Sequence, residues 1–168
     1  MRTFSLFAAT AGALAAVASA ASKCAADVPC IREGWCGSGP AFCMFSMCNP
    51  NESFSSTSCW KAEGCANQNV SFDSNSDAVA IASYNGNPKT NPFVSIFDPN
   101  NAVVSNGNLV LNMKYQADKN KGFGATASAA YTFQYGRVTA RIKTASIAKG
   151  VVTAFIIRND QIGDEIDF

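Results

Sequence analysis

The sequence of 168 residues contains no histidine. This absence excludes Ser-His-Asp and Cys-His catalysis, because both need an imidazole to take the proton from the nucleophile. Zinc binding is disfavoured too, since no Cys-x2-Cys pair is present to replace the missing imidazole ligands. An enzyme with this sequence must work with carboxylates, tyrosines, lysines or a metal, and the sequence itself gives no sign of a metal or another cofactor.

The sequence also carries little charge of either sign. Thirteen Lys and Arg balance twelve Asp and Glu, so the net charge is +1. Such a balance gives no electrostatic footprint for nucleic acid or for an acidic membrane surface. The low charged fraction, with many Asn, Ser and Thr, favours a secreted β-protein whose partner is neutral and polar.

Long apolar runs are absent except at the start of the sequence. Arg2 is followed by an apolar run over residues 4–17 and by the small residues Ala18-Ser19-Ala20. This layout is typical of a secretory signal peptide, which we place at residues 1–20 with cleavage after Ala20. A transmembrane helix would need about 20 apolar residues and a stop-transfer flank. We therefore expect a secreted protein with no transmembrane segment in its mature part.

Cysteine is absent from the last hundred residues, and all seven cysteines lie between residues 24 and 65. In an oxidising compartment this cluster predicts a disulfide-stapled module, which we place at residues 21–66. Because seven is odd, one thiol is free or has its partner elsewhere. The pairing of the others is left open by the sequence.

Two tripeptides match the acceptor motif for N-glycans, Asn51-Glu52-Ser53 and Asn69-Val70-Ser71. In a eukaryotic host, Asn51 and Asn69 could each carry a glycan. Such tripeptides are common by chance, so they add little to the assignment of function.

From about residue 67 onward, short strand-like runs are separated by turn residues. An Asn-Gly-Asn turn at residues 106–108 precedes an alternating apolar run over residues 109–115, which predicts a hairpin. Residues 135–144 repeat the alternation. Residues 150–158 are apolar on both faces, as in a strand inside a two-sheet stack. Residues 87–101 hold three prolines and predict a long loop with a short strand inside it.

These strands and turns predict an all-β fold, because no stretch outside the signal peptide gives a convincing helix. The expected architecture is an antiparallel β-sandwich (jelly roll), preceded by the small disulfide-rich module. Single-domain sandwiches often have about 200–250 residues, whereas only about a hundred follow the cysteine region here. We therefore expect residues 67–168 to form an incomplete sandwich, the amino-terminal part of a larger domain.

The last six residues, Gly-Asp-Glu-Ile-Asp-Phe, are the most acidic part of the sequence. If they form a strand, Glu165 and Asp167 share one face, while Ile166 and Phe168 share the other and face the core. A retaining glycosidase needs such neighbouring carboxylates, one as nucleophile and a second as general acid and base. A solvated strand end is the commoner explanation of an acidic pair that stands alone.

The acidic pair has a wider context. The sequence ends in YGRVTARIKTASIAKGVVTAFIIRNDQIGDEIDF (residues 135–168), which resembles the catalytic-strand region of family 16 glycoside hydrolases. The run NGNLVLNM resembles an early strand of that family, and the resemblance covers roughly residues 70–168. Within the family, the chain is similar to the fungal Crh-type cell-wall transglycosylases, which join chitin to β-glucan. In that subgroup a secretion signal and a cysteine-rich head precede the same domain.

The resemblance implies that Glu165 is the nucleophile and Asp167 the assisting carboxylate. The general acid/base would stand at position 169, one residue beyond this sequence, so these residues alone are expected to be inactive. The implied partners are cell-wall polysaccharides, chitin and β-glucan, and the implied location is extracellular or the cell wall, with a lipid anchor feasible in a missing carboxy-terminal part. The alternatives are an endo-β-1,3(4)-glucanase and a non-catalytic secreted wall-binding protein.

The cysteine region contains CIREGWCGSGPAFC (residues 30–43), which resembles the centre of hevein-type chitin-binding modules. The resemblance implies that Trp35 and Phe42 stack on sugar rings. The stretch departs from the pattern in three ways: Ile31 replaces a hydrogen-bonding serine, Glu33 replaces an aromatic residue, and Pro29-Cys30 stands in place of paired cysteines. A disulfide-stapled cap that only packs is therefore the alternative.

Other side chains of the second region could also meet a sugar. Arg141 and Lys143 could reach into a cleft, although charged residues on the polar face of a strand are usually just solvated. Aromatic residues could stack on sugar faces, although in a sandwich they more often belong to the core. The aromatic candidates are Phe123, Tyr131, Phe133 and Tyr135.

Overall fold

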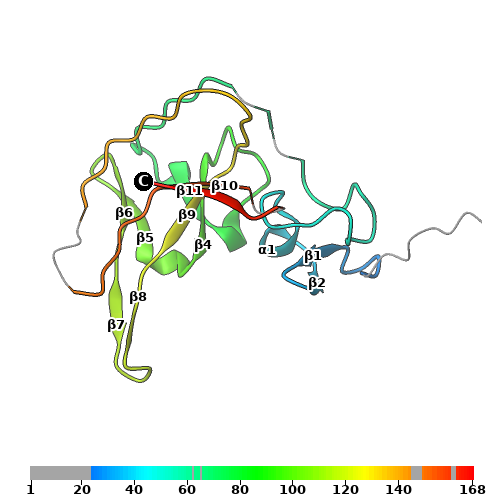
Figure 1. Ribbon diagram of the computed structural model, residues 1–168, viewed down its shortest axis with the longest axis horizontal. Coiled ribbons are helices and arrows are strands. Elements are labelled where there is room, and N and C mark those ends of the chain that lie inside the picture. The colour runs from blue at the N-terminus through cyan, green and yellow to red at the C-terminus, as the bar shows by residue number, and fades with distance from the viewer. Residues whose placement is uncertain (1–23, 62, 65, 145–148, 160–161) are drawn as a thin grey trace, which may run out of the picture.

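The computed structural model describes residues 24–61, 63–64, 66–144, 149–159 and 162–168. The predicted signal peptide and Cys65 lie outside these residues. Within them the chain consists mostly of short strands and turns, with a single four-residue α-helix and three 3-10 turns (Figure 1). None of the helices in these ranges has the length and apolar character needed to cross a membrane. The predicted all-β class with a disulfide-rich module is confirmed.

The cysteine module is a small hairpin and one helical turn joined by disulfides. Strands β1 (Cys30–Arg32) and β2 (Trp35–Gly37) pair antiparallel, and α1 (Pro40–Cys43) follows. The two residues of the connecting turn both have positive φ, as the favoured two-residue hairpin turn requires. Three disulfides hold these elements: Cys24–Cys36, Cys30–Cys43 and Cys48–Cys59.

A three-stranded sheet forms the centre of the second region. Strand β4 (Phe93–Phe97) lies between β3 (Ala78–Ala80) and β9 (Thr126–Ala129). The short strand predicted inside the proline-rich loop is therefore the central one. It pairs antiparallel with β9 but parallel with β3. The parallel pair differs from the sequence-based prediction of an antiparallel sandwich. Residues 81–92 provide the long crossover that a parallel pair needs.

Two hairpins extend from this sheet (Figure 1). Strands β5 (Ala102–Ser105) and β6 (Asn108–Leu111) enclose Asn106 and Gly107, whose φ values of 50° and 70° fit the predicted hairpin turn. Strand β6 ends at Leu111, although the Asn112 backbone N–H still donates to the Asn101 carbonyl in the register of this pair (2.7 Å).

The chain then resumes as a second hairpin, formed by β7 (Lys114–Gln116) and β8 (Lys121–Phe123). Three 3-10 turns complete the region: η1 (Asn75–Asp77), η2 (Ile81–Ser83) and η3 (Pro99–Asn101).

Two predicted strands differ from the structure. Residues 135–144 form no strand and are exposed, and strand β10 (Ile156–Asn159) contains only the end of the apolar run predicted over residues 150–158. Alternation gives a segment two different faces, but a strand also needs a neighbour for its backbone groups. No described strand pairs with residues 135–144.

The cysteine module and the sheet share one buried cluster. Met44, which follows α1, is fully buried with Tyr84, Val94 of β4 and Ala130. Trp60 packs against this cluster and against the cysteine cluster of the module, and its ring lies 6.0 Å from that of Tyr84. The module is therefore packed directly against the sheet.

Candidate active site

The acidic residues lie on a strand, as predicted. Strand β11 (Asp164–Asp167) pairs antiparallel with β10, and the two form a separate two-stranded hairpin (Figure 1). The turn is closed by the Gly163 backbone N–H, which donates to the Asn159 carbonyl (2.8 Å). The open end is held by the Phe168 N–H, which donates to the Phe155 carbonyl (3.0 Å).

Glu165 and Asp167 project from the same face of β11, because side chains alternate along an extended strand. Both residues are exposed. Two carboxylates that face solvent from one extended segment can approach the ring of a bound sugar together. A retaining glycosidase uses two neighbouring carboxyl groups, one as nucleophile and one as general acid and base.

Arg158 lies beside Glu165, although it was not among the residues predicted for the site. It lies directly opposite Glu165 in the hairpin register, and its Nε atom is 3.6 Å from Oε2 of Glu165. Both side chains are partly exposed, so the ion pair contributes little to the stability of the fold. The sequence contains the pattern that predicts this pair, because a hairpin turn that ends at Gly163 places residues 158 and 165 opposite each other.

The other face of β11 is open. Ile166 and Phe168 were predicted to enter the core, but they are 58% and 72% exposed. The Phe168 ring contacts the ring of Phe155 (centroids 5.8 Å apart), and Ile166 lies opposite Ile157. A two-stranded hairpin cannot bury its own apolar face without a further layer. The prediction of burial is therefore wrong for this structure.

Two hollows lie elsewhere on the described surface. One of about 480 Å³ is lined by Phe133 and Tyr135 with their neighbours, so these aromatic residues are exposed rather than part of the core. The other, of about 150 Å³, is lined mostly by polar side chains and includes Tyr131. Neither hollow is lined by Glu165 or Asp167.

The remaining candidates of the second region are accounted for by local contacts. Tyr131 donates its hydroxyl to the Pro88 carbonyl (2.7 Å), and burial together with the charge of Glu63 raises the pKa of Tyr131. Phe123 lies under the ammonium group of Lys119, 5.0 Å from its ring centroid. Arg141 and Lys143 are exposed, as expected of solvated side chains.

The two aromatic residues predicted to bind chitin differ in their surroundings. Trp35 begins β2 and is 77% exposed, so its ring is available for stacking. Phe42 is half-buried, and its ring packs on Gly37 so closely that a Cβ atom at Gly37 would overlap it. Part of the Phe42 ring therefore serves the packing of the module.

The two predicted glycosylation sites are both at the surface, because Asn51 and Asn69 are exposed. Their sequons differ in the third residue, which is buried at Ser53 and exposed at Ser71. For metals, the described ranges contain no group of three or more carboxylates or cysteines able to hold an ion.

The chain is similar to known proteins over most of its length. The family model for glycosyl hydrolases family 16 matches residues 89–168, which include both strands of the acidic hairpin. Crh-like protein 3 of Botryotinia fuckeliana is 34% identical over 154 residues, which are 91% of this chain and 32% of that protein. Crh-like protein 2 of Aspergillus fumigatus is 35% identical over 171 residues, or 97% of this chain and 36% of that protein.

A third relative, Congo red hypersensitive protein 2 of Saccharomyces cerevisiae, is 33% identical over 152 residues, covering 89% of this chain and 30% of that protein. The chain thus spans about a third of the length of the curated relatives it matches. No solved structure gives a significant match. The similarity to these relatives extends over the cysteine module as well as residues 89–168. Residues 89–168 carry the sequence pattern of glycosyl hydrolases family 16, and the chain as a whole is similar to Crh-like proteins of fungi.

Proposed function

We propose that the complete protein is a retaining glycosidase or transglycosylase that acts on cell-wall polysaccharide, with Glu165 as its nucleophile and Asp167 as the assisting carboxylate. The observation that carries the proposal is the strand β11, which presents both carboxylates on one exposed face inside the residues matched by the family. Retaining hydrolysis depends on two carboxyl groups that flank the scissile glycosidic bond, about 5–5.5 Å apart.

In the proposed first step, the Glu165 carboxylate attacks the anomeric carbon and the bond to the leaving sugar oxygen breaks. The leaving oxygen must receive a proton from a second carboxyl group. The family resemblance implies that this donor is a glutamate at position 169, directly after the present sequence. Asp167 lies between the two positions and would hold the nucleophile by a hydrogen bond, while Arg158 orients Glu165 from the neighbouring strand.

The second step decides between hydrolysis and transfer. The oxygen of water or of a sugar hydroxyl attacks C1 of the glycosyl-enzyme ester, the bond from C1 to Glu165 breaks, and the attacking oxygen gives its proton to the carboxyl group that served as acid in the first step. The reaction is a transfer when the acceptor sugar competes successfully with water. We propose transfer from chitin to β-glucan in the fungal cell wall, on the basis of the likeness to Crh-like proteins. The alternative within enzymes is an endo-β-1,3(4)-glucanase.

A non-catalytic alternative is a secreted protein that binds wall polysaccharide through the cysteine module. The observation that favours it is the exposed ring of Trp35 on the β1–β2 hairpin. A flat aromatic surface of this kind can stack on a sugar face. Retention of the full chain on chitin, with its loss in Trp35→Ala but not in Glu165→Gln, would support this function.

Turnover by a Glu165→Gln variant of the complete protein separates the two functions. We expect activity to fall by at least about a thousandfold, because the amide cannot form the covalent intermediate. Asp164→Asn is the matched control, since Asp164 is the adjacent acid on the opposite face of β11. The enzyme proposal fails if Glu165→Gln keeps wild-type turnover, or if both variants lose it equally.

A further inference from the structure

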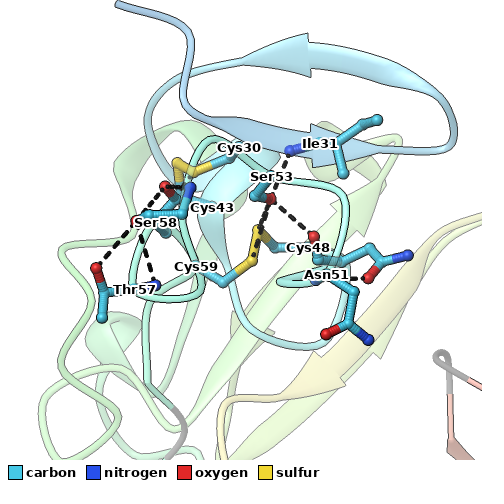
Figure 2. The surroundings of a disulfide bond; sticks show 11 residues. Cys30, Ile31, Cys43, Cys48, Asn51, Ser53, Thr57, Ser58 and Cys59 are labelled. Carbon is cyan, nitrogen blue, oxygen red and sulfur yellow. Dashed lines mark hydrogen bonds between the residues drawn. A yellow bond between two sulfur atoms is a disulfide. The ribbon is translucent and has the colours of Figure 1, made fainter. Parts of the chain in front are cut away.

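The hydroxyl of Ser53 lies at the centre of the cysteine module, although Ser53 is the third residue of the first sequon. Its side chain accepts a hydrogen bond from the Ile31 N–H (3.1 Å) and donates one to the Asn49 carbonyl (2.8 Å). Ser53 is only 3% exposed, and its Oγ atom also lies close to the sulfur atoms of Cys48 (3.5 Å) and Cys59 (3.6 Å). Figure 2 shows this hydroxyl between the strand that carries Ile31 and the Cys48–Cys59 disulfide.

The second sequon has the opposite environment. Asn69 and Ser71 are both exposed, and residues 66–73 belong to no helix or strand. Asn69 also lines the rim of the 150 Å³ hollow, so its amide group borders open space. An acceptor sequence in an exposed loop is the form in which this motif is usually modified.

The chemistry of N-glycosylation makes this difference important. The amide nitrogen of the asparagine forms a bond to C1 of an oligosaccharide carried on a lipid pyrophosphate. The bond from C1 to the pyrophosphate oxygen breaks, the lipid pyrophosphate leaves, and the nitrogen loses one proton. Because the motif requires a hydroxyl two residues after the asparagine, the transferase must reach that hydroxyl as well as the amide.

We propose that the folded chain offers Asn69 to the transferase, and that Asn51 accepts a glycan only before the Cys48–Cys59 loop closes. Closure places Ser53 in the buried hydrogen bonds described above, even though Asn51 itself stays exposed. The occupancy of Asn51 therefore reports how quickly this disulfide forms during secretion. The inference depends on a eukaryotic secretory route and is independent of the catalytic role of Glu165.

A transfer reaction on the purified full chain tests the proposal. Chain without glycans is oxidised to form its disulfides, then incubated with a single-subunit oligosaccharyltransferase and its lipid-linked oligosaccharide. Peptide mass spectrometry measures both sites. We expect Asn69 to exceed Asn51 by a factor on the order of ten or more, because a segment with a buried, hydrogen-bonded hydroxyl opens only in a minor fraction of molecules. Reduction of the disulfides should bring the two sites close to equal occupancy.

A pair of double variants distinguishes local closure from general unfolding. Cys48→Ser with Cys59→Ser should raise the occupancy of Asn51 several-fold under oxidising conditions. Cys24→Ser with Cys36→Ser removes a different disulfide of the same module and should leave Asn51 protected. Equal modification of both sites in the oxidised wild-type chain, no modification of Asn69, or equal exposure of Asn51 in the two variants would each overturn the proposal.

Discussion

The cysteine module and the acidic hairpin are built from similar short antiparallel strands, yet their side chains are in opposite environments. In the module, disulfide cysteines themselves form a buried cluster, and Met44 joins the module to the core of the central sheet. In the hairpin, every residue of β11 is exposed. We infer that the module and the β3–β4–β9 sheet carry most of the stability, whereas the hairpin carries the candidate chemistry.

The largest effect on stability is expected at the joint between module and sheet. Met44→Ala should lower the free energy of unfolding by about 2–5 kcal/mol, because it removes a fully buried side chain and leaves a cavity. Urea unfolding measures the change, with Met113→Ala as a matched control at an exposed position. If Met44→Ala costs no more than Met113→Ala, the module does not share a core with the sheet.

A smaller effect is expected for the buried hydroxyl of the module. Ser53→Ala should cost about 1–3 kcal/mol, since the Ile31 N–H would be buried without its acceptor. Ser56→Ala provides the comparison at an exposed serine nearby and should change stability by less than about 0.5 kcal/mol. Both variants are compared by urea unfolding of chain without glycans. Equal costs would argue that the Ser53 hydrogen bonds contribute nothing.

The hairpin should be far more tolerant. Ile166→Ala is expected to cost less than about 1 kcal/mol in this chain, because the side chain is already mostly exposed and leaves no cavity. The same urea titration applies. A loss as large as that of Met44→Ala would mean that another surface covers Ile166, and the contrast between the two regions would then disappear.

Burial of Tyr84 in the shared core should also make the free energy of unfolding depend on pH in the alkaline range. Burial, with smaller contributions from Tyr131 and Glu63, raises the pKa of Tyr84 above the usual 10.0. The unfolded chain therefore loses this proton first, so stability is full below pH 10 and falls as the pH rises further. Unfolding free energies measured on either side of this value should differ less in Tyr84→Phe than in the wild type. If the difference is the same in Tyr84→Phe and in the wild type, groups other than Tyr84 cause the loss of stability at alkaline pH.

Local signals predicted the parts of the fold that depend on neighbouring residues. The clustered cysteines predicted the module, Asn106 and Gly107 predicted the β5–β6 turn, and the alternation of residues 164–168 predicted β11. Each of these features is determined by a few consecutive side chains, through turn conformation, strand alternation or disulfide formation.

Long-range contacts could not be predicted in the same way. The parallel pairing of β3 with β4 and the packing of Met44 on the sheet both join segments far apart in the sequence. Alternation in residues 135–144 predicted two faces but could not supply the neighbouring strand that pairing needs. Ser53 looked only like part of a sequon, because its hydrogen bond to Ile31 crosses 22 positions.

The assignment of Glu165 is tested most directly by trapping the intermediate. The complete protein is incubated with a mechanism-based fluoroglycoside, which slows breakdown of the glycosyl-enzyme ester, and the labelled peptide is mapped by mass spectrometry. We predict a label on Glu165, with none on Asp167 or Asp164. A label on any other carboxylate would contradict the account.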